Sequence, residues 1–265
     1  MVVLETRDLT RRFDALVAVD HLNIRVDTGR VFGLLGSNGA GKTTVIKMLT
    51  TLLPPSSGTA TVVGFDIRTQ AAKVRRVIGY VPQMVSADGT LTGYENLLIF
   101  AKLYDIPRRD RDGRIADALA LMELTDAADK LVRDYSGGMI RRLEIAQSML
   151  HRPPVLFLDE PTVGLDPIAR NSVWERVRRL THDFDTTIVL TTHLMEEADA
   201  LCDTIAILHR GRVAVSGSPA ELKASVQKPG ATLDTVFVRY AGGAVESGGS
   251  YRDVSRDRRT ALRVG

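Results

Sequence analysis

Short apolar runs alternate with helix-like segments along most of the chain. Four of these runs, 31–35, 77–81, 155–158 and 187–191, lack the polar alternation of a strand with one exposed face. Runs of this kind are typical of parallel strands that helices cover on both faces of a sheet. The pattern therefore predicts an α/β fold with a largely parallel sheet.

Other parts of the chain differ from this pattern. The opening stretch, up to about residue 26, alternates more and predicts an antiparallel side sheet, while 203–208 and 212–215 predict a hairpin. Residues 84–154 contain several helical segments and no convincing strand, with a polar loop expected at 107–113. We interpret 84–154 as a helical subdomain inserted into the sheet domain.

The regular pattern fades after about residue 225. Two glycine-rich stretches, 241–243 and 247–250, predict a flexible connection to an arginine-rich end. We therefore expect one large domain over 1–225 and a partly flexible C-terminal extension over 226–265.

Charge and composition narrow the function classes. The net charge is +3, and residues 239–265, with six arginines and three acids, account for all of it. The neutral remainder argues against nucleic acid as a partner. A single cysteine excludes an internal disulfide and fits a reducing compartment. No signal-peptide pattern opens the chain, and no apolar run approaches the ~20 residues of a membrane helix. We expect a cytoplasmic chain whose membrane role, if it has one, depends on another polypeptide.

The loop at 36–44 carries the strongest chemical signal. It has the spacing G-x-x-x-x-G-K-[ST], follows an apolar run and opens a helical pattern. Glycines allow the backbone N–H groups to turn toward phosphate oxygens, the lysine supplies a cation, and the first threonine can bind Mg²⁺. The loop predicts binding of a nucleoside triphosphate. Its residues are Gly36, Ser37, Asn38, Gly39, Ala40, Gly41, Lys42, Thr43 and Thr44.

Two acids end the apolar run 155–158. Asp159 can hold Mg²⁺ through its water shell, and Glu160 can orient or deprotonate an attacking water. Two other predicted strands run into Gln83 and His193. Because ligands of open α/β sheets bind beyond the carboxyl ends of the strands, these side chains and Lys42 predict one nucleotide site.

A second glycine-containing turn precedes another helical pattern. Ser136 is a good N-cap, so the segment could simply begin a helix. Alternatively, Gly137 and Gly138 allow a phosphate to approach the helix terminus closely.

Together these motifs resemble the nucleotide-binding subunit of an ABC transporter, over residues 1 to about 225. The loop at 36–44 matches the Walker A motif and 155–160 matches Walker B. Ser136, Gly137 and Gly138 match the signature motif. Other matches are Gln83 of the Q-loop, the switch His193, Asp166 in the D-loop Gly164-Leu165-Asp166, and Phe13 as the aromatic that stacks on adenine.

The resemblance implies a P-loop NTPase with a RecA-like core, an N-terminal antiparallel β-subdomain and an inserted helical subdomain. It implies ATP and Mg²⁺ as cofactors and hydrolysis of ATP to ADP and phosphate. Lys42, Glu160 and His193 would be catalytic, whereas Thr43, Gln83 and Asp159 would hold the metal. Phe13, the Walker A residues, Gln83, the signature residues and Asp166 would bind nucleotide.

The resemblance also implies partners. A second ATP-binding subunit, in a head-to-tail homodimer, would complete each nucleotide site, and a separately encoded permease would lie in the membrane. The chain would then sit on the inner face of the cell membrane. Within 84–96, the segment after Gln83 would carry movement to that permease.

The signature departs from the usual L-S-G-G-Q, because Tyr135 and Met139 stand at its ends. This version, followed by the run 141–146, resembles the daunorubicin-resistance-type branch of drug and lipid exporters, as do 92–97, 194–198 and 232–237. The core motifs alone leave an importer ATPase open. A soluble ABC ATPase fits less well, because 84–154 is too short for a long coiled coil and each motif occurs once. The intact set of Lys42, Asp159, Glu160 and His193 opposes a binding module without catalysis.

Overall fold

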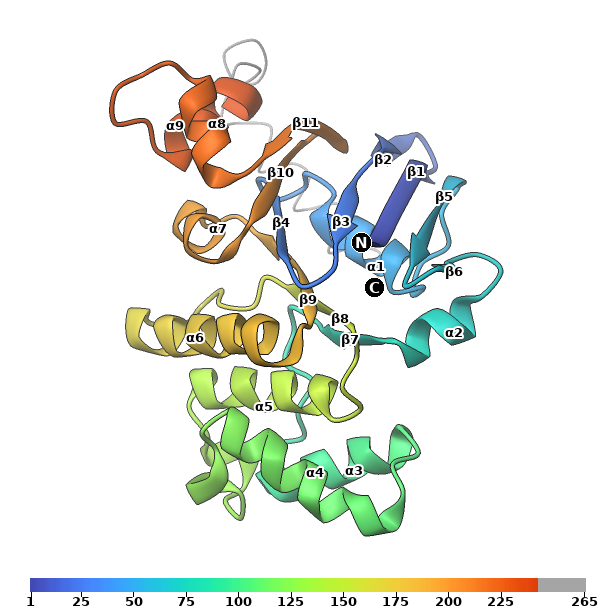
Figure 1. Ribbon diagram of the computed structural model, residues 1–265, viewed down its shortest axis with the longest axis vertical. Coiled ribbons are helices and arrows are strands. Elements are labelled where there is room, and N and C mark those ends of the chain that lie inside the picture. The colour runs from blue at the N-terminus through green and yellow to red at the C-terminus, as the bar shows by residue number, and fades with distance from the viewer. Residues whose placement is uncertain (243–265) are drawn as a thin grey trace, which may run out of the picture.

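A six-stranded sheet forms the centre of the computed structural model, which describes residues 1–242. Its strand order is β11-β10-β4-β9-β8-β7, with β11 antiparallel to its neighbour and the others parallel (Figure 1). All four buried strands predicted from the apolar runs are present, and the predicted hairpin is β10–β11. The strands are β4 (Val31–Leu35), β7 (Ile78–Val81), β8 (Val155–Asp159), β9 (Thr187–Thr192), β10 (Thr204–His209) and β11 (Arg212–Gly217).

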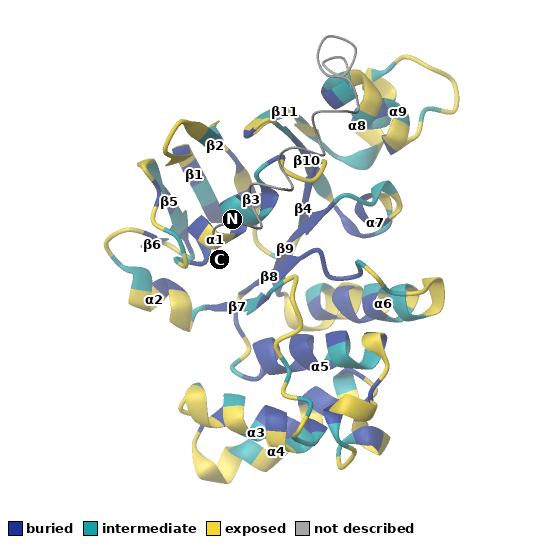
Figure 2. Cartoon of the chain, turned by 180° about the vertical axis from the view of Figure 1, so that it is seen from behind, coloured by how far each residue is buried: buried dark blue, intermediate teal, exposed yellow. Residues whose placement is uncertain are grey.

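Consecutive residues of these strands enter two different cores. In β8, Val155 and Phe157 face one core, whereas Leu156 and Leu158 face the other. This follows from the two-residue period of a strand, and it requires apolar side chains at every position. Figure 2 shows the result as buried strands between layers whose outer surfaces are exposed.

A second sheet, antiparallel throughout, covers one face together with helix α1 (Lys42–Leu49). The predicted side sheet is confirmed, and two strands that the sequence did not predict, β5 and β6, extend it. Helix α2 (Ala71–Arg76) follows these strands and leads into β7. The strands are β1 (Val2–Phe13), β2 (Leu16–Leu22), β3 (Arg25–Asp27), β5 (Ser57–Val62) and β6 (Phe65–Asp66).

The predicted helical subdomain contains helices α3 (Gly93–Leu103), α4 (Arg108–Leu121) and α5 (Gly137–Met149), with short 3-10 turns between α4 and α5. The polar loop expected at 107–113 is wrong, because α4 begins at Arg108. Pro107 precedes it with a φ of −54°, which suits entry into a helix. Burial of Ile115 and other apolar residues farther along α4 holds this charged first turn in the helix.

Helices α6 (Pro167–Phe184) and α7 (Met195–Leu201) lie on the sheet face opposite α1 (Figure 1). After α8 (Pro219–Ser225), where the sequence pattern fades, the chain forms α9 (Leu233–Phe237) and a π-helical turn, Val238–Gly242. Several of their side chains join the core on this face, namely Leu233, Val236 and Ala241.

The flexible connection expected from residue 241 is wrong for residues 241 and 242, which belong to the π-helical turn. The rest of that connection and the arginines from 252 onward lie outside the described residues. The division of the chain at residue 225 stays a prediction.

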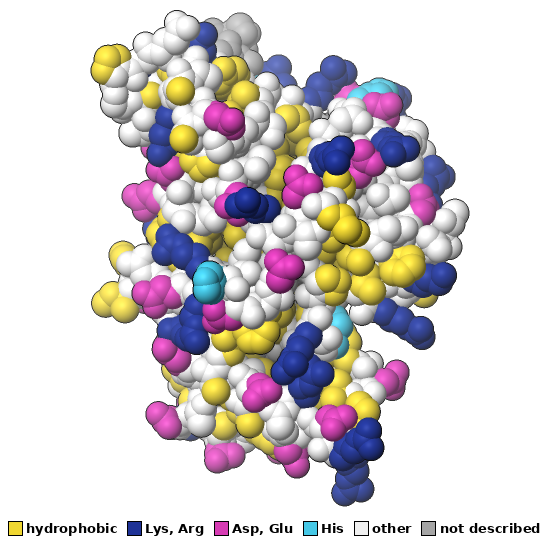
Figure 3. Space-filling view, viewed as in Figure 1, with side chains coloured by type: hydrophobic (Ala, Val, Ile, Leu, Met, Phe, Trp, Pro, Cys, Tyr) yellow, Lys and Arg dark blue, Asp and Glu magenta, His cyan; other side chains and the backbone are white. Residues whose placement is uncertain are grey.

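Within residues 1–242, none of the helices combines the length and the apolar character needed to cross a membrane. On the face drawn in Figure 3, basic and acidic side chains are interspersed over the sheet domain and the helical subdomain alike.

Candidate active site

The loop between β4 and α1 is a tight turn with glycine in the left-handed backbone region at two positions. Gly39 and Gly41 have φ values of +82° and +105°. A Cβ atom on Gly41 would lie 2.5 Å from the carbonyl oxygen of Ala18, so the loop and strand β2 are in close contact. The loop leads directly into α1 at Lys42, which leaves the first N–H groups of that helix free for an anion.

The turn of the β10–β11 hairpin supports this loop from the side. The Gly211 N–H donates to the carbonyl of Ala40 at 3.0 Å, and the Gly211 carbonyl accepts from the Asp20 N–H at 2.9 Å. Gly211 has a φ of +79°, and a Cβ there would lie 2.8 Å from the Ala18 carbonyl. The hairpin turn therefore fixes the loop at 36–44 against the antiparallel sheet.

Lys42 is buried, with 5% of its surface exposed. Its Nζ donates to the carbonyls of Gly36 at 2.8 Å and Ser37 at 3.2 Å, and it lies 3.1 Å from Glu160 Oε1. An ammonium group has three donors, so these three oxygens use its full capacity. A phosphate can bind Lys42 only by replacing one of them.

Of the two acids at the end of β8, Asp159 contacts two hydroxyl groups. The Thr43 hydroxyl donates to Asp159 Oδ1 at 3.2 Å, and the Thr191 hydroxyl donates to the same oxygen. Burial, with a smaller contribution from the Asp159 charge, raises the pKa of the neighbouring Tyr80 to about 12, so this phenol stays neutral.

Glu160 has a φ of +50°, which costs a residue with a Cβ about 1–2 kcal/mol. This left-handed backbone turns its carboxylate away from the line of the strand.

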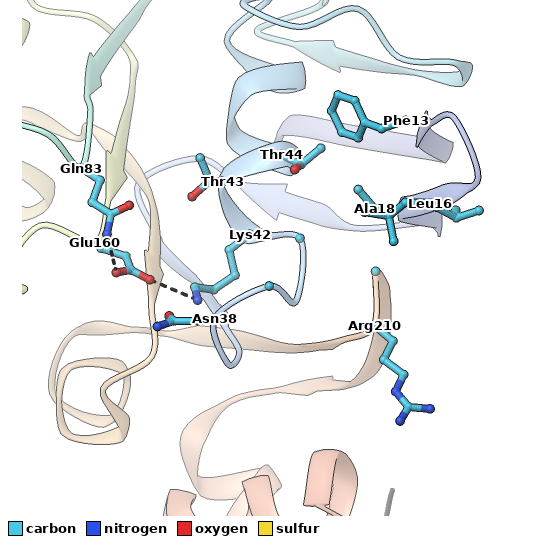
Figure 4. A pocket seen from close by; sticks show the side chains of 14 residues that line it. Phe13, Leu16, Ala18, Asn38, Lys42, Thr43, Thr44, Gln83, Glu160 and Arg210 are labelled. Atoms are coloured by element: carbon cyan, nitrogen blue, oxygen red, sulfur yellow. Dashed lines mark hydrogen bonds and ion pairs between the residues drawn. The ribbon is translucent and has the colours of Figure 1, made fainter. Parts of the chain in front are cut away.

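Gln83 and His193 converge on that carboxylate. Gln83 Nε2 donates to Glu160 Oε2 at 3.1 Å, and His193 Nδ1 lies 3.3 Å from Glu160 Oε1. Figure 4 shows Gln83 and Lys42 approaching Glu160 from opposite sides. The predicted meeting of side chains from four strand ends is therefore found in the structure.

A cleft of about 590 Å³ opens beside these groups. Phe13 borders it with 41% of its surface exposed, and the Arg11 guanidinium lies 4.5 Å from the centre of its ring. Sequence reasoning missed a group of lining residues that come from the antiparallel sheet and the hairpin turn. No local sequence pattern distinguishes these residues, because only the tertiary fold brings them to the cleft. They are Leu16, Val17, Ala18, Arg210 and Gly211.

The second glycine-containing turn is not part of this cleft. Ser136 caps α5 by accepting the Met139 N–H at 3.3 Å, and Asp166 caps α6 in the same way. A Cβ on Gly138 would lie 2.8 Å from the Cβ of Ala169, so the two helix starts pack together. Ser136 and Asp166 are exposed and do not line the cleft.

Comparison with known proteins identifies the family. The family model described as ABC transporter matches residues 19–163. The chain belongs to the ABC transporter family.

Individual relatives agree with this assignment. The daunorubicin/doxorubicin resistance ATP-binding protein of Streptomyces peucetius is 47% identical over 84% of this chain and 67% of its own length. The Nod factor export ATP-binding protein I of Sinorhizobium fredii is 42% identical over 83% of this chain and 64% of its own length. A solved ATP-binding subunit of an ABC transporter superposes with a TM-score of 0.79 at 30% identity, over 90% of this chain and 99% of that structure.

The chain is thus an ATP-binding subunit of the ABC type and an ATPase. ABC ATPases generally bind ATP with Mg²⁺, and the residues present fit both. The Thr43 hydroxyl and the Asp159 carboxylate, 3.2 Å apart beside Lys42, are oxygen ligands of the kind that Mg²⁺ prefers.

The contact between the hairpin turn and the Walker A loop can be tested with Gly211→Ala. The added methyl group would push against the Ala18 carbonyl and shift the N–H that holds Ala40. We expect ATP affinity, measured by titration with a fluorescent ATP analogue, to fall by about tenfold, as a loss of 1.4 kcal/mol produces.

Gly230→Ala is the matched control. Gly230 has a φ of +70°, but a Cβ there would meet no atom within 4 Å. It should lose similar stability through backbone strain and keep wild-type ATP affinity. Equal affinities for the two variants would show that the hairpin turn does not position the loop.

Proposed function

We propose that this ABC ATPase powers export of a hydrophobic drug, antibiotic or lipid through a separately encoded membrane subunit, at the inner face of the cell membrane. The observation that carries the ATPase part is the buried Glu160 carboxylate, held by Lys42 and Gln83 beside the Walker A loop, with His193 3.3 Å away. The export part is supported by the relatives named for daunorubicin resistance and Nod factor export.

In the proposed reaction, Lys42 exchanges Glu160 for a phosphate oxygen. The exchange keeps the ammonium saturated and frees a carboxylate oxygen next to the terminal phosphate. Glu160 can then orient a water for attack and accept its proton. His193 lies close enough to Glu160 to hold the attacking water or the phosphate from the other side.

Thr43, Asp159 and Gln83 would hold Mg²⁺ in this site. The metal would neutralise charge on the phosphates during transfer. Gln83 donates to Glu160 here, so its side chain would have to turn from Glu160 toward the metal. Phe13 would stack on the adenine at the outer end of the cleft.

The site needs a second subunit, in this proposal a copy of the same chain. Ser136 stands at the start of a thirteen-residue helix, where N–H groups favour an anion, yet it is exposed and outside its own chain's cleft. A head-to-tail dimer would place the Ser136, Gly137 and Gly138 turn of one subunit over the nucleotide of the other, with Asp166 nearby. ATP would then favour the closed dimer, because it contacts both subunits only in that state.

Glu160→Gln tests the assignment of the base. The amide keeps the shape and one acceptor oxygen but accepts no proton, so turnover should fall at least about 100-fold. ATP-dependent dimerisation, followed by size-exclusion chromatography, should persist. Hydrolysis at the wild-type rate would remove Glu160 from this role.

Mixing two inactive variants tests the shared site. Lys42→Ala removes the cation of the Walker A loop, and Ser136→Glu places a negative charge where phosphate would bind. In a mixed dimer, one site has both an intact Lys42 and an intact Ser136. If the subunits assort randomly, half of the dimers are mixed, so ATPase activity should return to roughly a quarter of wild type. No recovery on mixing would contradict a site shared between two copies.

Export is tested in cells that express this chain together with a membrane protein of about six spans that an adjacent reading frame encodes. We expect resistance to daunorubicin or doxorubicin to rise several-fold and intracellular drug to fall, because the relative is named for that resistance. The Glu160→Gln variant serves as the control and should give no resistance. Increased drug uptake with the wild-type pair would support an importer instead.

A further inference from the structure

A stripe of polar side chains on helix α5 is buried against the loop that follows strand β7. We call Arg141, Glu144, Gln147 and Ser148 the polar stripe, and none of them is more than 6% exposed. Their spacing of three and four residues places them on one side of the helix. Burying charged groups costs free energy unless they find partners, so their contacts indicate what the stripe does.

Arg141 and Glu144 bind the backbone of the loop directly. Arg141 Nη1 donates to the carbonyl of Pro82 at 2.7 Å, and its Nη2 donates to the carbonyl of Gln83 at 3.0 Å. The N–H and the hydroxyl of Ser86 both donate to Glu144 Oε1. The two charged side chains also lie 3.0 Å apart.

The other members of the stripe continue these contacts. Ser148 donates its hydroxyl to the carbonyl of Tyr80 at 3.0 Å, within β7. Gln147 donates to Asn96 Oδ1 at 3.3 Å, and Asn96 in turn binds the backbone of Asp88. Four side chains of helix α5 are therefore hydrogen-bonded to the segment 80–96.

The loop residues that Arg141 and Glu144 bind lie on either side of two exposed apolar residues in the sequence. Met84 and Val85 are 82% and 62% exposed, and they lie between the bonded residues Gln83 and Ser86. Gln83 is held at two points, because its carbonyl accepts from Arg141 while its side chain donates to Glu160. One residue thus links the active-site carboxylate, the apolar tip at 84–85 and helix α5.

We propose that Arg141 and Glu144 are positioning residues that hold the backbone of Gln83 beside the nucleotide site and tie residues 84–85 to helix α5. This rests on the proposed function, in which Gln83 acts on the nucleotide and the segment after it contacts the membrane subunit. Because Ser136 begins the same helix, displacement of α5 by the partner subunit's nucleotide moves the apolar tip with it.

Arg142 provides a matched comparison. It is the next residue of α5 and also an arginine, partly buried, but it donates to the carbonyls of Met122 and Glu123 within the helical subdomain. Its removal should weaken packing without changing the loop.

The test compares Arg141→Ala and Glu144→Ala with Arg142→Ala in the full chain. Hydrogen–deuterium exchange of peptides covering 82–90 should accelerate roughly tenfold or more in the first two variants, because bonds to a charged group are lost. For both, kcat for ATP hydrolysis should fall about tenfold while KM for ATP stays within about twofold, since the Walker A loop, which these changes leave intact, supplies most of the contacts that bind ATP before the reaction. Arg142→Ala should leave exchange in 82–90 and kcat as in wild type.

A second background separates positioning from general stability. In the Gln83→Ala chain, adding Arg141→Ala should lower kcat no further, because both changes act through the same side chain. Arg141→Lys, which restores a cation but not two parallel bonds, should recover part of kcat. An equal loss of kcat in both backgrounds, or unchanged exchange in 82–90, would overturn the proposal. Full hydrolysis by Glu160→Gln would defeat the proposed function, and the exchange data would still decide the role of Arg141 and Glu144.

Discussion

The site is organised around one buried negative charge, the Glu160 carboxylate, which is 6% exposed. A carboxylate in this setting requires donors, and they come from Lys42 after β4 and Gln83 after β7, while His193 after β9 lies 3.3 Å away. These strands and β8 are parallel neighbours, so the sheet alone brings their carboxyl ends together at one edge. The sheet order therefore determines which side chains can reach Glu160. The left-handed backbone at Glu160 is also required, since it turns the carboxylate toward these side chains.

Much of this could be predicted from the sequence, because it depends on local patterns. Four buried strands were recognisable as continuous apolar runs, since residues facing two cores leave no room for polar alternation. The Walker A loop was recognisable from the positions of its glycines and lysine. Strand-end residues such as Gln83 and His193 followed from the rule that parallel strands end at one edge.

The remaining features depend on contacts between distant segments. The hairpin turn at Gly211 was predicted as a turn, but no local signal says that its N–H reaches Ala40. Cleft residues on β2 have no pattern that separates them from ordinary strand residues. Charged residues after Pro107 read as a loop by composition, and burial of Ile115 later in the segment makes them helical. Glu160's positive φ is likewise set by its neighbours, because its own propensity opposes it.

The polar stripe of α5 illustrates how such distant contacts tie a site to the rest of the molecule. The loop at 82–88 lacks regular secondary structure, so its carbonyl and N–H groups must find partners outside a helix or strand. An apolar face on α5 would pack as tightly but would leave the carbonyls of Pro82 and Gln83 without donors. Arg141 supplies both donors from one planar group, and Glu144 holds that group while accepting from Ser86. The same bonds that satisfy the loop prevent it from moving independently of the helix. The hydrogen bonds that the loop backbone requires thus also connect the nucleotide site mechanically to the apolar tip at 84–85.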